Sequence, residues 1–163
     1  MILRTRMMFS IMLLGMLLPA VSLGRTNAGK IHLYKGASTY SSDIVCTWDG
    51  KHLYKGNSTY SSDILYTWDG KHLYKGSTTY SSDILYTWDG KHVYKGKSSA
   101  YSSDIIATYD GKHVYKGATT YRSDILFTTD ASHLYQGATT YKSDIILTWD
   151  MKIPVAVLLA ILL

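Results

Sequence analysis

The sequence predicts an all-β protein built from tandem β-hairpins, and three observations carry this prediction. Between residues 30 and 150 one unit of 20 residues occurs six times, with one inserted residue, Ala100, in the fourth copy. All twelve acidic residues are Asp, although Glu is a favoured residue of helix surfaces. Fifteen Tyr and four Trp, with only two Pro, exclude a disordered chain. Both faces of the predicted hairpins carry apolar residues, so we expect a stacked solenoid, a closed ring or a two-layer meander.

Residues 1–22 have the pattern of a secretory signal peptide. Arg4 and Arg6 form a basic start, residues 7–18 are apolar, and Ala20 and Ser22 place small side chains where a signal peptidase reads. Such an apolar stretch is too short for a permanent membrane-spanning helix, which needs about 20 residues. We therefore expect a secreted or cell-envelope protein, with residues 23–29 as a short linker before the repeats. The alternative is an uncleaved membrane anchor.

The unit contains two predicted strands joined by a turn, which is Asp-Gly in four of the copies. In the second copy the β-branched and aromatic residues 64–68 precede this turn, which is a strong hairpin signal, and the return strand follows it. A two-residue type I′ turn would place Trp68 opposite Lys71 and Tyr66 opposite Leu73. The remaining residues of the unit form a polar connection to the next hairpin. One face of the hairpin would carry Ile64, Tyr66, Trp68 and Leu73, and the other Leu65, Thr67, His72 and Tyr74.

Residues 151–163 form an apolar C-terminal tail. Every residue from Ile153 onward is apolar, and Pro154 suits the first turn of a short helix. The tail is too short to cross a bilayer, which takes about 20 residues. A repeat array needs caps because its last unit has no neighbour that buries its apolar surface. We expect the tail to cover an open end of the array, with a membrane tail anchor as the alternative.

The repeated His, Asp and Ser residues do not point to catalysis. Every copy carries the same set, whereas an active site is normally one asymmetric constellation. Turns and local caps account for the Asp residues, and no His-x-x-x-His pair or Cys pair supplies a zinc site. Cys46 stands alone at an apolar position, which excludes an internal disulfide. We therefore predict a protein that is not an enzyme, with no metal and no cofactor, in which His72 is half-exposed and bonded to Thr67 across the strands.

Aromatic side chains offer the candidate binding surface. The positions of Tyr54, Tyr60 and Trp68 recur through the units. Aromatic rings stack on sugar faces and on cations, and repetition strengthens weak sites through effective concentration. Most of these rings are needed for the core, whereas the Tyr60 position lies in the polar connection and should be displayed. The candidate ligand-binding residues are Tyr40, Tyr60, Tyr80, Tyr101, Tyr121 and Tyr141.

The unit Gly-x-Ser-Thr-Tyr-Ser-Ser-Asp-Ile-Leu-Tyr-Thr-Trp-Asp-Gly, residues 56–70, resembles that of uncharacterised secreted bacterial proteins with repeated Tyr-Ser-Ser-Asp-aliphatic motifs. The resemblance covers residues 30–150 and implies no known activity or binding residues. A weaker resemblance is to the knotted β-repeat (septoil) domains, although the repeat here is longer and contains an Asp-Gly hairpin. The aromatic hairpins are also similar to choline- and glucan-binding repeats, without their paired Trp-Tyr-Tyr aromatics.

These features together predict an exported, non-enzymatic repeat protein that binds a glycan or another repetitive envelope polymer. The alternative is a structural or self-assembling protein whose repeats only build a stable array. Lys51 and Lys55 should face solvent, where they would protect strand edges or attract anionic polymers. The formal charge of +5 is too small to indicate a nucleic-acid partner. Contact with a membrane is expected only through the signal peptide or, as the lesser alternative, the tail.

Overall fold

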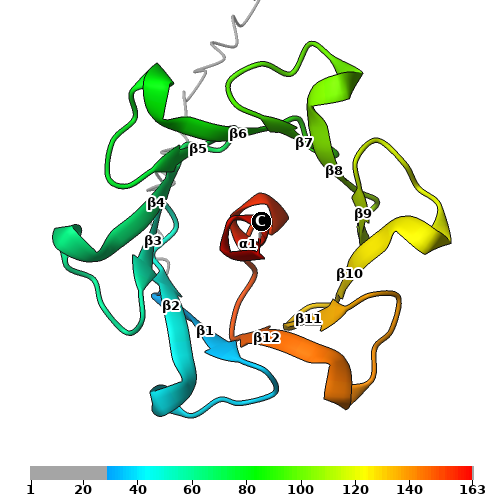
Figure 1. Ribbon diagram of the computed structural model, residues 1–163. Helices are drawn as coiled ribbons and strands as arrows, with labels where there is room; N and C mark the ends of the chain where they lie inside the picture. Colours follow the sequence, from blue (N-terminus) through cyan, green and yellow to red (C-terminus); the bar gives the residue numbers. More distant parts are fainter. Residues whose placement is uncertain (1–28, 163) are drawn as a thin grey trace, which may run out of the picture.

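A computed structural model describes residues 29–162, which form a closed barrel of antiparallel strands around one central helix (Figure 1). Strands that are neighbours in the sequence are neighbours in the barrel, and the last strand pairs with the first. Among the predicted arrangements the protein therefore has the closed meander of tandem hairpins. The predicted signal peptide, residues 1–22, and all but the last residue of the linker lie outside the described residues.

The barrel contains six copies of a strand, a short 3-10 turn and a second strand. The first three copies comprise β1 (Ile31–Lys35), η1 (Ser41–Asp43), β2 (Ile44–Trp48), β3 (His52–Lys55), η2 (Ser61–Asp63), β4 (Ile64–Trp68), β5 (His72–Lys75), η3 (Ser81–Asp83) and β6 (Ile84–Trp88). The others comprise β7 (His92–Lys95), η4 (Ser102–Asp104), β8 (Ile105–Tyr109), β9 (His113–Lys116), η5 (Arg122–Asp124), β10 (Ile125–Thr129), β11 (His133–Gln136), η6 (Lys142–Asp144) and β12 (Ile145–Trp149). The central helix α1 (Val155–Leu162) follows.

The hairpin register differs from the predicted one. Trp68 pairs with Leu73 and Tyr66 pairs with Lys75, whereas a two-residue turn would place Trp68 opposite Lys71. The predicted register is therefore wrong by two residues. Because side chains alternate between faces with a period of two, a shift of two leaves Tyr66, Trp68 and Leu73 on one face, as predicted.

The Asp-Gly turn itself is not of type I′, and this explains the shift. A type I′ turn needs positive φ at two residues, but within residues 29–162 only glycines have positive φ, including Gly70 at 101°. The Asp69 carboxylate instead accepts hydrogen bonds from the backbone N–H groups of Lys71 and His72, at 2.8 and 2.6 Å. The side chain of Asp69 thus organises a longer turn.

Ile64 and Leu65 each lie on the other face from the one predicted. Tyr66 pairs with Leu53 and Ile64 pairs with Tyr54, so Leu65 is the extra residue of a β-bulge. Leu65 packs against the apolar core, not with Thr67 on the outer face. The bulge resets the alternation at this point.

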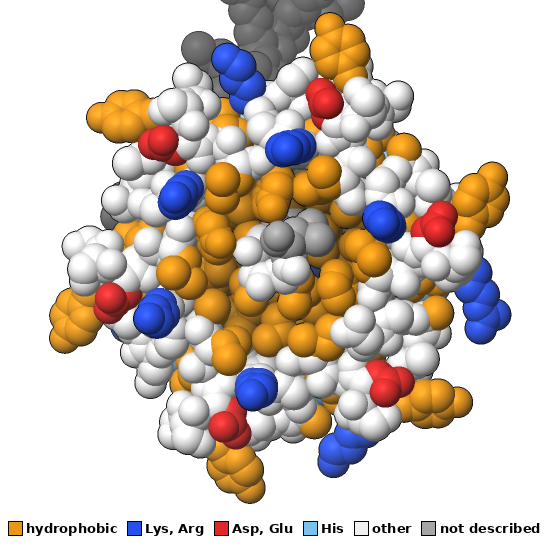
Figure 2. Space-filling model, in the orientation of Figure 1, with side chains coloured by type: hydrophobic (Ala, Val, Ile, Leu, Met, Phe, Trp, Pro, Cys, Tyr) orange, Lys and Arg blue, Asp and Glu red, His pale blue; other side chains and the backbone are white. Residues whose placement is uncertain are grey.

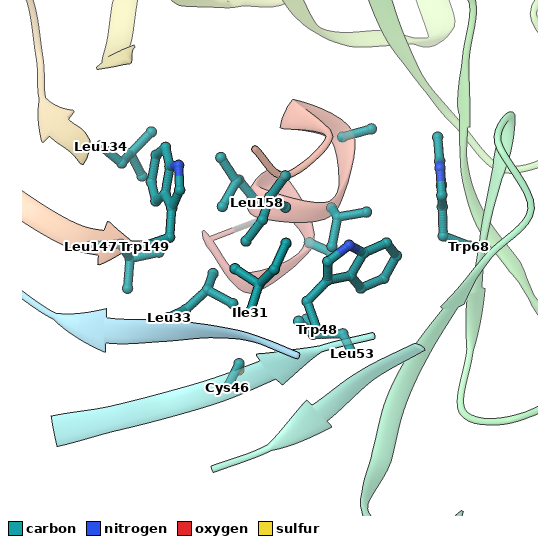
Figure 3. Close-up of a cluster of buried hydrophobic side chains, with 14 of the residues drawn as sticks. Ile31, Leu33, Cys46, Trp48, Leu53, Trp68, Leu134, Leu147, Trp149 and Leu158 are labelled. Atoms are coloured by element: carbon teal, nitrogen blue, oxygen red, sulfur yellow. The ribbon is translucent and has the colours of Figure 1, made fainter. Parts of the chain in front are cut away.

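The lumen of the barrel is the hydrophobic core, and α1 fills it along the axis (Figure 1). The side chains of Trp48, Trp68, Trp149 and Leu158 lie around and on the helix, together with inward-facing leucines of the strands (Figure 3). Side chains alone fill barrels of about eight strands, so a wider barrel needs a further element inside. The apolar tail therefore occupies the axis instead of covering an open end of the array, because a closed ring has no such end.

Every residue of α1 is apolar, as is typical of a helix without a solvent-facing side. Its buried residues are Ala156, Val157, Leu158, Leu159 and Ala160. Between residues 29 and 162, no helix has the length and hydrophobicity needed to span a membrane.

A row of buried threonine hydroxyls holds the connections onto the outside of the barrel. The fully buried Thr67 donates through Oγ1 to the carbonyl of Gly76 at 2.7 Å. At the seam between β12 and β1, Thr148 makes the same bond to Gly36, also at 2.7 Å. The seam is therefore closed like the other hairpins. Equivalent bonds start from Thr47, Thr87, Thr108 and Thr128.

Candidate functional site

The candidate site is a tyrosine rim, which we define as Tyr40, Tyr60, Tyr80, Tyr101, Tyr121 and Tyr141. These six side chains are 67–77% exposed. An aromatic side chain projects from the tip of each of the six lobes in Figure 2. The strand tyrosines of the Tyr54 position are only 6–8% exposed. The tyrosines of these two repeated positions therefore differ, the Tyr54 position being buried and the Tyr60 position displayed as expected.

The backbone at each rim tyrosine is held by its own loop. The Tyr60 N–H donates to Ser58 Oγ at 3.2 Å, and the Tyr60 carbonyl accepts from the Asp63 N–H at 2.9 Å. The Ser58 hydroxyl also donates to the Asp63 carboxylate. Gly56 begins the loop with φ of 58°, a left-handed conformation that suits glycine. The loop therefore fixes the backbone of the tyrosine, while the ring extends into solvent.

The fourth unit keeps its rim tyrosine although its loop is one residue longer. The inserted Ala100 takes the hydrogen bond to Ser98 Oγ, at 3.2 Å, that the rim tyrosine makes in the second unit. Tyr101 remains 67% exposed, and its carbonyl still accepts from the Asp104 N–H at 3.1 Å. The loop absorbs the insertion without burying the ring.

Lysines surround the end of the barrel that carries the rim. Five of the six units place an exposed lysine at the end of the first strand of the unit, and the sixth has Gln136. In Figure 2 basic side chains encircle a central apolar area, and acidic side chains lie farther out, near the tips of the lobes. The face therefore combines aromatic, apolar and mixed-charge surface. The five lysines are Lys35, Lys55, Lys75, Lys95 and Lys116.

The Asp-Gly turns contain a second repeated group, formed by an Asp, a His and a Tyr. Asp69 Oδ2 accepts from the Tyr74 hydroxyl at 2.7 Å and lies 3.0 Å from His72 Nδ1. Burial alone would raise the pKa of Asp69, but hydrogen bonds from the His72 and Lys71 N–H groups and from Tyr74 outweigh it and hold that pKa well below its usual range. The carboxylate is therefore a permanent acceptor that orders the turn.

This group corrects the prediction for His72. Its cross-strand neighbour is Thr87, not Thr67, and its hydrogen-bond partner is Asp69. Within residues 29–162, a His–Thr hydrogen bond occurs only between β1 and β2, where His32 Nδ1 lies 3.2 Å from Thr47 Oγ1. The sequence contains a signal that was missed, because Asp-x-x-His-x-Tyr recurs at every internal turn. Within residues 29–162 no three potential metal ligands cluster together.

Cys46 lies in the core, where its side chain is buried. Burial raises the pKa of its thiol to about 11. The thiol therefore behaves as a small apolar group, not as a nucleophile.

A closed ring of six β-hairpins with a helix on its axis and a displayed tyrosine on each lobe defines a class of radially repeated all-β proteins. The model of the 6-fold beta flower protein family matches residues 33–158, and the chain belongs to this family. The match ends at residue 158, within α1. Neither a curated protein nor a solved structure matches the chain.

Proposed function

We propose that this protein is a non-enzymatic binding module that uses its tyrosine rim to hold a repetitive polymer, in the first place a glycan of the cell envelope or extracellular space. The observation that carries the proposal is the equivalent exposure of six tyrosines, at 67–77% each. Leaving a large ring in water forgoes the free energy that its burial would contribute. Six such rings on one molecule, one of them kept despite an inserted residue, support display as their role.

The chemistry of the rim suits weak, repeated contacts with sugars. A phenol ring offers an apolar face for the C–H face of a sugar and a hydroxyl for one of its polar groups. Each contact is weak, but six contacts around one ring raise the effective concentration of the next site once the first is occupied. The five exposed lysines add attraction for anionic polymers. No cofactor is needed for such binding.

Export supports the same function, and we include it in the proposal. Residues 1–22 have the pattern of a signal peptide, and the repeat unit resembles that of small secreted bacterial repeat proteins. An envelope polymer would be the repetitive ligand nearest to such a protein.

The test is retention of the purified protein on insoluble polysaccharides and on isolated cell envelopes. We expect retention of the natural protein and its loss in the triple variant Y60S/Y80S/Y101S. A matched control changes the exposed neighbours in the same three loops, T59A/T79A/S99A, and should be retained like the natural protein. Thermal unfolding of all three proteins shows whether each variant is still folded.

Two outcomes would contradict the proposal. If the natural protein is retained on no matrix, the rim does not bind these polymers. If the folded triple variant is retained as well as the natural protein, binding lies elsewhere. Sedimentation at rising concentration then tests the alternative of a self-assembling protein, which predicts association that the rim substitutions reduce.

A further inference from the structure

The Trp ring at the Asp-Gly end of the lumen is incomplete. Six equivalent positions, at the last residue of the second strand in each unit, surround the start of α1, and four of them are Trp. The two exceptions occur in neighbouring units, where Tyr109 ends β8 and Thr129 ends β10. The six residues are Trp48, Trp68, Trp88, Tyr109, Thr129 and Trp149.

A cavity of about 660 Å³ lies at this gap in the ring. Its wall includes Trp88, Tyr109, Thr129 and Trp149, and Leu158 of α1 lines its inner side. The volume falls within the range of about 300–1,000 Å³ that is usual for small-molecule sites. Because the smaller residues occur in only two units, the cavity is a single asymmetric feature of a six-fold molecule. It lies among the Asp-Gly turns, whereas the tyrosine rim lies in the other connections.

The hydroxyl groups in the cavity can accept hydrogen bonds but have no hydrogen left to donate. The Tyr109 hydroxyl donates to the Gly111 carbonyl at 2.8 Å, and Thr129 Oγ1 donates to the Lys112 carbonyl at 3.2 Å. The two hydroxyl oxygens lie 3.3 Å apart. Each keeps lone-pair capacity as an acceptor. A ligand that meets them must therefore bring its own N–H or O–H donor.

Apart from Asp130 and the exposed Lys152, the rest of the lining is aromatic, aliphatic or glycine. Trp88 and Tyr109 lie with their ring centroids 6.4 Å apart and their planes tilted by 47°. The indole N–H of Trp149 already donates to the Ala131 carbonyl at 3.0 Å. The Asp130 carboxylate is bonded to the Tyr135 hydroxyl at 2.6 Å. A sugar with many hydroxyls would find too few polar partners among these residues, whereas a flat apolar ring would find aromatic faces.

We propose that this cavity binds one small planar aromatic molecule that carries an N–H or O–H donor, of the indole or phenol type. The aromatic ring of the ligand packs among Trp88, Tyr109 and Trp149, and its donor meets the oxygens of Tyr109 and Thr129. This site is separate from the tyrosine rim and does not depend on the polymer-binding proposal.

The first experiment titrates the natural protein with indole by calorimetry or ligand-observed NMR. We expect one site per chain. The variant Thr129→Trp restores the residue found at four of the six positions and fills the cavity, so indole binding should fall by at least about tenfold. The rim variant Y60S/Y80S/Y101S serves as the control and should bind indole as the natural protein does.

A second pair of variants keeps the proposal testable if Thr129→Trp does not fold. Thr129→Val and Tyr109→Phe preserve the shape of the cavity but each remove one hydroxyl oxygen. Both substitutions should weaken indole binding severalfold. N-Methylindole has no N–H, so it should bind the natural protein and the two variants equally. Absence of indole binding, indole binding that survives in folded Thr129→Trp, or tighter binding of methyl glucoside or tetramethylammonium than of indole would each overturn the proposal.

Discussion

The hydroxyl of Thr67 shows how a single buried polar group holds a connection to the barrel. The hydroxyl donates to the Gly76 carbonyl and cannot bond to water instead, because Thr67 is fully buried. Thr67→Val keeps the shape but leaves the carbonyl without this donor, so the free energy of unfolding should fall by about 1–2 kcal/mol. Denaturant titration measures the loss. The control is Thr79→Val at an exposed position. Equal losses of unfolding free energy in the two variants would show that burial of the bond is unimportant.

The aspartates of the turns predict the pH dependence of stability. The pKa values of Asp49, Asp69, Asp89, Asp110 and Asp130 are all lowered in the fold; burial opposes this shift, and hydrogen bonds outweigh it. A lowered pKa stabilises the fold at pH values above the unfolded pKa of about 3.9, and this stability is lost as the pH falls toward the folded pKa. The melting temperature should therefore drop steeply below about pH 4. A melting temperature that stays constant down to pH 2 would contradict this account.

Exposure of individual residues was easier to predict than their contacts. Tyr60 stands among Ser, Thr and Asp in a connection, so its display follows from its neighbours in the sequence. The bond between His72 and Asp69 could not be predicted in the same way. It depends on a turn in which a side chain, not a pair of positive φ angles, sets the geometry.

At the scale of elements, composition predicted the strands but not their register. Residues 64–68 form β4 with the predicted bounds because β-branched and aromatic residues favour strands. The pairing of Trp68 with Leu73 and the bulge at Leu65 depend on hydrogen bonds between strands, which leave no mark in a pattern of alternating residues. The aliphatic residue at this position contacts the core in four of the copies, as Val45, Leu65, Ile106 and Ile146.

The helix α1 should contribute to stability mainly through its central residues. Leu159 is fully buried, whereas Leu162 is half-buried near the end of the helix. Leu159→Ala should lower the free energy of unfolding by about 2–5 kcal/mol, because it removes apolar contacts and leaves a cavity. Leu162→Ala should cost clearly less. Equal costs in a denaturant titration would argue against a helix packed on all sides within the barrel.

The number of units sets the width of the whole molecule. The diameter of a barrel grows with the number of its strands, so a ring of five units would be too narrow for α1. Deletion of residues 71–90, one complete unit, should therefore abolish cooperative unfolding or produce a different oligomer, as seen by circular dichroism and size-exclusion chromatography. Deletion of Ala100 alone removes only the insertion and should leave the fold intact. A five-unit monomer that melts cooperatively would contradict this view of closure.

Closure of the ring could not be decided from the sequence. A solenoid and a ring are built from the same repeat, and they differ in the angle between successive units. That angle arises from twist and bulges that are shared by all copies, so comparing the copies does not reveal it. The tail was also ambiguous for this reason, since only a closed ring provides a lumen for it.

The position of α1 has a consequence for biosynthesis. The helix follows β12 in the sequence, and the partners Leu33 and Trp149 meet across the seam from opposite ends of the repeat region. On the ribosome, all six units are therefore made before the segment that fills their interior. Until α1 is made, the apolar lining of the six units lacks the segment that packs inside it in the finished fold, so seam formation and helix insertion fall in a late step after translation of the repeats. Until that step, chaperones that bind exposed apolar segments can act on the chain.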